Sequence, residues 1–113
     1  MSKSDRSRVI RFAQVRIPDP AGERSDNFMQ RGTLDVALSL APSTNQQTPH
    51  AQDEIYVIIP GRGILFHDGE GEPFESGDLV FVAAGIEHRF GEISEDLAVW
   101  RVFYGAEGGE VPA

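Results

Sequence analysis

Apolar and polar residues alternate most regularly along residues 33–41, with the sequence TLDVALSLA. A period of two places successive side chains on opposite faces of a β-strand. We therefore predict a half-buried strand here, with one face in a core. The apolar face carries Leu34, Val36, Leu38 and Leu40, and the other face carries Thr33, Asp35, Ala37 and Ser39.

Short apolar segments separated by turn sequences recur along the rest of the chain. Proline, glycine and polar residues predict breaks or turns at 18–27, 42–49, 60–63 and 67–73. No window has the sustained spacing of an amphipathic helix. The pattern predicts an all-β sandwich or barrel. The predicted strands are residues 9–17, 33–41, 54–59, 63–67, 79–83, 88–90 and 97–104.

The chain length of 113 residues fits one domain. We expect a flexible N-terminus at residues 1–7, a single β-barrel domain at residues 8–105 and a C-terminal tail at residues 106–113. The barrel would be closed by short turns between neighbouring strands. Any functional site is therefore expected within this single domain.

Three predicted strands, IYVII, LVFVA and LAVWRVFY, carry apolar residues on both faces. A small barrel on its own would leave one of these faces partly exposed to water. A symmetric homodimer is the simplest cover, because it also hides the edges of the sheets. The alternative is that the predicted N-terminal strand folds across the body of the same chain.

The composition, 40% hydrophobic and 25% charged, is that of an ordinary folded protein, and the net charge is −8. An acidic body repels phosphates and anionic lipids, so we expect neither nucleic acid nor a membrane as partner. The absence of cysteine excludes disulfides, thiolate zinc sites and cysteine nucleophiles. Since there is no apolar signal region and no apolar run near the roughly 20 residues of a membrane span, we expect a cytoplasmic location.

His50 and Glu54 stand at the mouth of an apolar strand, four positions apart. In one straight strand this spacing separates them by about 13 Å. Two bonds to a zinc-type ion span only about 4 Å in total. They share an ion only if the chain bends at Ala51–Asp53, where the residues are polar. Two interpretations stay open: both are solvated loop residues, or both turn inward and hold a metal ion.

A third ligand could come from the stretch SGDLVFVAAGIEHRFG, which contains His88. It repeats the outline of the first stretch, with a strand, a turn and a histidine beside the turn. Antiparallel pairing of the two stretches would bring His88 close to His50 and Glu54. The geometry thus allows two imidazoles and one carboxylate to converge inside a barrel.

These two stretches resemble the paired motifs of the cupin superfamily, which are small barrels of the double-stranded β-helix, jelly-roll-like type. His50, Glu54 and Gly61 match the first motif from its second histidine onward, with three and then six residues between them. In the second motif the positions of two glycines and the histidine are matched. Those positions are held by Gly77, Gly85 and His88.

The chain also departs from both motifs. Thr48 stands at the first histidine position, Ala83 at the proline position and Glu92 at the asparagine position. Gln47 or Gln52 could supply an amide oxygen in place of the missing histidine, or water could fill the gap. The two motifs span residues 48–92, under half of the chain.

The resemblance implies that His50, Glu54 and His88 occupy three of the four usual metal-ligand positions. Two imidazoles and a carboxylate suit a divalent ion: Fe(II), Mn(II), Co(II), Ni(II) or Zn(II). It implies either a metal-dependent enzyme acting on a small polar molecule, as a dioxygenase, isomerase or lyase, or a non-catalytic small-molecule-binding or sensing module. In the enzyme, Glu54 could alternate between ligand and general base. The missing histidine at Thr48 favours the module.

Other polar residues have simpler interpretations. Asp53 is expected to face solvent beside the bend, since neighbouring residues of a strand point to opposite faces. His67 is interpreted as a histidine flanking a turn. Arg89 and Arg101 could hold an anionic substrate, but salt bridges with the surplus carboxylates are the preferred interpretation. The core or the dimer interface is expected to contain Phe81, Phe90, Trp100, Phe103 and Tyr104.

Overall fold

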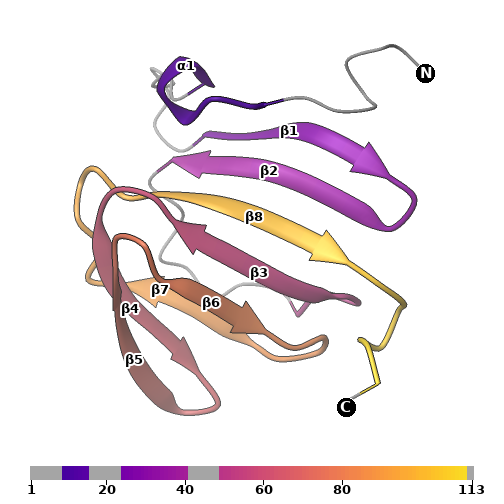
Figure 1. The fold of residues 1–113 in the computed structure, drawn as a ribbon. Coiled ribbons are helices and arrows are strands. Elements are labelled where there is room, and N and C mark those ends of the chain that lie inside the picture. Colours follow the sequence, from indigo (N-terminus) through magenta and orange to yellow (C-terminus); the bar gives the residue numbers. More distant parts are fainter. Residues whose placement is uncertain (1–8, 16–23, 41–48, 112–113) are drawn as a thin grey trace.

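The computed structural model describes residues 9–15, 24–40 and 49–111 of the chain. This part of the chain contains one helical turn and eight strands (Figure 1). The elements are α1 (Phe12–Val15), β1 (Arg24–Arg31), β2 (Leu34–Leu40), β3 (Asp53–Ile58), β4 (Arg62–His67), β5 (Glu70–Glu75), β6 (Leu79–Val82), β7 (His88–Gly91) and β8 (Ala98–Tyr104).

The strands form two antiparallel sheets. The larger sheet has the order β1-β2-β8-β3-β6, and the smaller sheet has the order β5-β4-β7. The last strand, β8, lies between β2 and β3, as Figure 1 shows, so that distant parts of the chain are paired. This arrangement is an open jelly-roll barrel and confirms the predicted all-β fold.

Side chains from both sheets meet in one core. Alternate residues of β3 and β8 face inward, and directly opposite pairs such as Ile58 and Val99 share that face. Phe90 of β7 packs edge-on against Tyr56 of β3, which joins the two sheets across the barrel. The buried cluster consists of Tyr56, Ile58, Leu65, Phe74, Val80, Val82, Phe90, Leu97 and Val99.

The turn between β3 and β4 carries the chain from the larger sheet to the smaller one. Gly61 in this turn has a φ of 108°, a conformation that L-residues other than glycine rarely adopt. Its N–H donates to Ser76 Oγ at 3.0 Å, and the next N–H, of Arg62, donates to Ser94 Oγ at 3.0 Å. A Cβ at Gly61 would lie 2.6 Å from Leu97 Cα, so the position has room only for glycine.

The N-terminal strand predicted at residues 9–17 is wrong where the structure describes it. Residues 12–15 form a single helical turn without a buried residue, and residues 16–17 lie outside the described part. The apolar alternation was real, but these residues pair with none of the described strands. No helix within the described ranges is long and apolar enough to cross a membrane.

Two strands were predicted to be breaks or turns. Residues 24–27 form the start of β1, although the sequence RSDN suggested a loop. Residues 70–73 belong to β5, and the true turn is the pair Asp68-Gly69, where both φ angles are positive. Both misassigned strands lie at the edge of a sheet, where polar residues and a proline such as Pro73 are tolerated.

The predicted alternation along β2 is only partly reflected in its burial. Ala37 and Ser39, on the face expected to be polar, are buried along with Leu38. Both faces of this strand are therefore covered at its centre. By register, Leu38 lies opposite Trp100 on the outer face and Ala37 lies opposite the inward Arg101. The apolar face predicted to lie in the core therefore points out of the barrel, which corrects that prediction.

The outer face of the larger sheet is apolar and partly exposed. The register places the outward residues of β3, β6 and β8 side by side on this face. Two of them, Leu79 and Phe81 on β6, are 63% and 52% exposed. The homodimer expected from the sequence stays a prediction, and this is the surface it would use. The outer face, in this sense, consists of Ile55, Val57, Leu79, Phe81, Trp100 and Val102.

A charge placed on this surface is expected to break the dimer. Phe81→Glu would introduce an unpaired carboxylate into an apolar interface, which costs several kcal/mol, or about a hundredfold or more in dimer dissociation constant. Light scattering during gel filtration should give twice the chain mass for the unaltered protein and the single chain mass for this variant.

The matched control is Val111→Glu, because Val111 is 90% exposed and lies outside the outer face. This variant should keep the dimer mass. A single chain mass for the unaltered protein at micromolar concentration would contradict the prediction.

Candidate metal centre

A bend brings His50 toward Glu54, as the spacing argument required. Ala51 and Gln52 form the bend, and the strand begins at Asp53. The backbone of the bend is fixed by two hydrogen bonds, from Gly85 N–H to the His50 carbonyl at 2.9 Å and from Gly108 N–H to the Ala51 carbonyl at 2.7 Å. The loop conformation therefore depends on two other segments of the chain.

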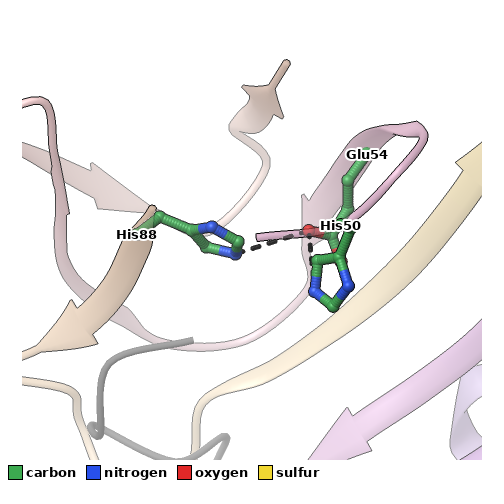
Figure 2. A group of neighbouring side chains, drawn as sticks. All are labelled: His50, Glu54 and His88. Atoms are coloured by element: carbon green, nitrogen blue, oxygen red, sulfur yellow. Dashed lines mark ion pairs between the residues drawn. The ribbon is translucent and has the colours of Figure 1, made fainter. Parts of the chain in front are cut away.

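His50, Glu54 and His88 converge at one end of the barrel. His88 Nε2 lies 3.4 Å from Glu54 Oε1, and His50 Nε2 lies 3.9 Å from the same oxygen. Figure 2 shows both rings beside the carboxylate, with dashed lines for these two contacts. One potential ligand atom from each of the three residues lies within 4.8 Å of the other two. The predicted convergence of the three side chains is confirmed.

The three residues come from different parts of the fold. Glu54 belongs to β3 of the larger sheet, His88 begins β7 of the smaller sheet, and His50 belongs to the bend. The side chains of Glu54 and His88 are at most 1% exposed, whereas that of His50 is 35% exposed. The group is thus closed on the side of the core and open on the side of His50.

The Glu54 carboxylate lacks the hydrogen bonds that a buried charge normally has. Both of its oxygens are buried, and neither accepts a hydrogen bond of good geometry within the described residues. Buried polar atoms are nearly always paired, because leaving water without compensation is costly. A cation between the carboxylate and the two imidazoles would supply the missing interaction. The residues present therefore fit a divalent metal ion.

His88 is oriented by its hydrogen bonds. Its Nδ1 lies 3.1 Å from the Ile86 carbonyl oxygen, so Nδ1–H donates there in the neutral ring and Nε2 faces the barrel with its lone pair. The Tyr56 hydroxyl lies 3.1 Å from that Nε2 and can donate to it. Tyr56 was not anticipated from the sequence, although its position two residues after Glu54 places it on the same face of β3.

The electrostatics of the two imidazoles differ. Burial lowers the pKa of His50, and the nearby Glu54 carboxylate only partly opposes this effect. Burial would also lower the pKa of His88, but Glu54 and the Ile86 carbonyl outweigh it, and the pKa is raised. Burial and the charge of Glu54 raise the pKa of Tyr56, so its hydroxyl keeps its proton. Both imidazoles must be neutral to bind a metal ion.

Asp53 is buried, which corrects the expectation that it faces solvent. It does point away from Glu54, but its side chain accepts hydrogen bonds from Glu110 N–H and Ala84 N–H, each at 3.0 Å. These two bonds lower the pKa of Asp53. The residue at the mouth of the strand thus anchors the C-terminal segment. The covering residues are distant in sequence, which is why the spacing argument missed them.

Three residues matter for the missing fourth ligand: Thr48 at its position, and Gln47 and Gln52 as possible accessory ligands. Gln47 and Thr48 lie outside the described residues. The side-chain amide of Gln52 donates to the Gly105 carbonyl at 2.9 Å and to the Thr33 carbonyl at 3.1 Å. Gln52 therefore ties the bend to two other loops, and we do not include it among the metal ligands.

A second group of possible ligands lies at the hairpin of β4 and β5. His67 ends β4 and has carboxylate oxygens of Asp68 and Glu72 at 3.6 Å. Glu70 and Glu72 are exposed, so water solvates their charges. His67 flanks the turn, as interpreted from the sequence. This group gives no comparable reason to hold an ion.

The two arginines form no ion pair within the described residues, contrary to the preferred interpretation of the sequence. The Arg89 guanidinium lies over the Phe66 ring, 4.1 Å from its centroid. The Arg101 guanidinium lies 5.1 Å from the centroid of Phe103. Phe103 also contacts His50, with ring centroids 4.7 Å apart. Arg101 is therefore a neighbour of the candidate metal centre, whereas Arg89 is not.

Comparison with known proteins gives matches to one family. The family model described as "Cupin domain" matches residues 38–104. An uncharacterized protein of Streptomyces coelicolor is 36% identical over 96 residues, which cover 78% of this chain and 91% of that protein.

Solved structures with low sequence identity have the same fold. A putative mannose-6-phosphate isomerase from Ralstonia eutropha JMP134 superposes with a TM-score of 0.70 at 20% identity, covering 84% of this chain and 94% of that chain. A cupin superfamily protein from Desulfitobacterium hafniense DCB-2 gives 0.71 at 13% identity, with 89% and 94% covered. A conserved barrel domain protein from Salinispora arenicola CNS-205 gives 0.64 at 18% identity, with 88% and 90% covered.

Proposed function

The chain belongs to the cupin domain family, and on that premise we propose that it binds one divalent metal ion through His50, Glu54 and His88. The ion would lie at the end of the barrel where these side chains meet. Two imidazoles and one carboxylate suit Fe(II), Mn(II), Co(II), Ni(II) or Zn(II). Remaining coordination positions would be open to water or to a small polar molecule.

The observation that carries this proposal is the buried, unsatisfied carboxylate of Glu54. Its nearest cationic candidates are two histidines. The pKa of His50 is lowered by burial, and the pKa of His88 is raised by Glu54 itself. A core of this size would otherwise favour a neutral residue at the position, because a buried charge without hydrogen bonds costs several kcal/mol. A metal ion explains why glutamate is there.

The hydrogen bonds around His88 prepare the site for an ion. The Ile86 carbonyl holds the ring of His88 with Nε2 toward Glu54, which reduces the cost of ordering that ligand. The hydrogen bond that Tyr56 can donate to Nε2 would have to move on metal binding, and the Glu54 carboxylate on the same face of β3 would be its acceptor. His50 would be the solvent-exposed ligand, on the side from which water reaches the site.

Two functions are compatible with such a site. The first is a metal-binding or small-molecule-sensing module without catalysis. The second is an enzyme on a small polar substrate, for which a bound ion would supply Lewis-acid activation. The second Glu54 oxygen favours the enzyme, because it accepts no hydrogen bond in the described residues and could take a proton as general base while the first contacts the ion.

Metal content tests the proposal directly. Protein isolated without chelators should contain about one equivalent of a transition metal by elemental mass spectrometry. His50→Ala and His88→Ala should each lose it, because each removes one of only three protein ligands in the described group. The loss in affinity should be at least about a hundredfold, since even residues that merely orient a ligand contribute about ten- to a hundredfold.

The matched control is His67→Ala, which removes a histidine of similar accessibility from the hairpin group. Its metal content should equal that of the unaltered protein. Equal loss in all three variants, or loss only in His67→Ala, would reject the central site.

A further inference from the structure

Arg101 lies on the inner face of the larger sheet, beside the candidate metal centre. It is directly opposite Tyr56 on β3 and Ala37 on β2. Glu54 is directly opposite Phe103, the next inward residue of β8. The guanidinium and the carboxylate therefore project from the same face, in neighbouring rows of the barrel.

Arg101 has no polar partner among the described residues. Its Nε is buried and donates no hydrogen bond, and the guanidinium forms no ion pair there. Asp35, diagonally placed on β2, accepts a hydrogen bond from the Gln30 amide. The chain has eighteen acidic residues and a net charge of −8, so an inward arginine that forms no ion pair with a described carboxylate is unexpected. Burying its donors without a partner is costly.

Phe103 connects Arg101 to the metal centre. One ring contacts both groups, with the His50 ring at 4.7 Å and the Arg101 guanidinium at 5.1 Å between centres. The charge of Arg101 also acts on His50. Burial is the main cause of the lowered pKa of His50, and the charge of Arg101 acts in the same direction. Arg101 and the exposed member of the metal centre, His50, therefore lie against the same aromatic ring.

We propose that Arg101 binds the carboxylate of a small organic acid whose neighbouring polar group reaches the metal centre formed by His50, Glu54 and His88. The contact between the polar group and the metal centre rests on the proposed function, whereas the contact between the carboxylate and Arg101 does not. A guanidinium presents a planar pair of donors that matches a carboxylate. A single arginine satisfies one carboxylate, whereas the three oxygens of a phosphate group call for more donors than this face offers.

The first test uses the metal-free full chain, so that it does not depend on the metal. In ¹⁵N-labelled protein, the Nε–Hε signal of Arg101 is assigned by its loss in Arg101→Lys. Titration with glycolate should shift this signal, and glycolamide, its uncharged analogue, should not. The Nε–Hε signal of Arg89 should not move with either compound, because that guanidinium lies over Phe66 outside the inner face.

The second test compares variants. Arg101→Met should weaken glycolate binding by about tenfold or more, since a charge-assisted hydrogen bond is removed. Arg101→Lys should recover part of the affinity. The matched control Arg89→Met should bind glycolate as the unaltered protein does. Added Ni(II) should strengthen glycolate binding in the unaltered protein, and less so in Arg101→Met.

The outcomes separate the two proposals. A shift of the Arg101 signal without any gain on adding Ni(II) keeps Arg101 as the carboxylate site and rejects the metal centre as its second contact. Tight Ni(II) binding with no shift of Arg101 rejects this inference and leaves the metal centre standing. Equal binding by Arg101→Met and the unaltered protein, or tighter binding of inorganic phosphate than of glycolate, also overturns it.

Discussion

Glu54→Gln is expected to stabilise the metal-free protein while abolishing its stabilisation by metal. The substitution keeps the shape of the side chain and removes a charge that is 1% exposed and accepts no hydrogen bond within the described residues. We expect the free energy of unfolding of the metal-free form to rise by about 1–3 kcal/mol. Urea denaturation in the presence of a chelator measures this quantity.

Added metal should reverse the order of the two proteins. At a free metal concentration a hundred times the dissociation constant, the unaltered protein gains about 2.7 kcal/mol, whereas the variant with a neutral amide gains little. Two denaturation series, with and without metal, are therefore needed. If Glu54→Gln is the more stable protein without metal and the less stable one with metal, Glu54 is a ligand whose burial destabilises the metal-free form.

The control for this experiment is Glu72→Gln, the same substitution at an exposed glutamate. It should change the stability by less than about 0.5 kcal/mol under both conditions. If Glu54→Gln instead destabilised the metal-free form, the carboxylate would belong to a structural ion pair with His88, and the argument from its missing partners would fail.

Gly61→Ala is expected to lower the free energy of unfolding by about 2–6 kcal/mol. A φ of 108° costs a non-glycine residue about 1–3 kcal/mol. The new Cβ would also lie 2.6 Å from Leu97 Cα and 2.8 Å from Ser94 Oγ, and such overpacking costs a further 1–3 kcal/mol or so. Because Leu97 is in the buried core, its backbone has little freedom to move away.

Gly32→Ala separates the two contributions. Gly32 also has a positive φ, of 55°, but a Cβ there meets no atom within 4 Å. It should cost only about 1–2 kcal/mol, the price of the left-handed conformation alone. Chemical denaturation of both metal-free variants gives the comparison. Equal losses in the two variants would show that the close approach to Leu97 relaxes at no cost.

The convergence of His50, Glu54 and His88 could be predicted because it depends on the distance that a strand places between residues four apart. A strand of fixed rise keeps residues four apart too distant to share an ion, so a shared site requires a bend, and only the polar residues between them could form one. The core strands were equally readable, since their apolar residues are buried by partners of the same kind.

The parts that the sequence did not reveal depend on partners distant along the chain. Asp53 is buried by the segment that contains Glu110, more than fifty residues later. The strand β5 contains Pro73, which local rules assign to a turn but which an edge position allows. The segment around Phe12 has the alternation of a strand but forms a helical turn without a buried residue. Local pattern does not show which segments pair.

The unequal exposure of the three converging side chains has a kinetic consequence. Among the described residues, Glu54 and His88 are sealed by the core and His50 is the exposed ligand, so a chelator or an incoming ion would approach past the ring of His50. That ring belongs to a bend whose backbone is fastened by Gly85 and Gly108 rather than by a sheet. The lifetime of a bound ion would therefore be governed by how often this one bend opens, and sequence changes at its two fastening glycines would alter exchange without touching a ligand.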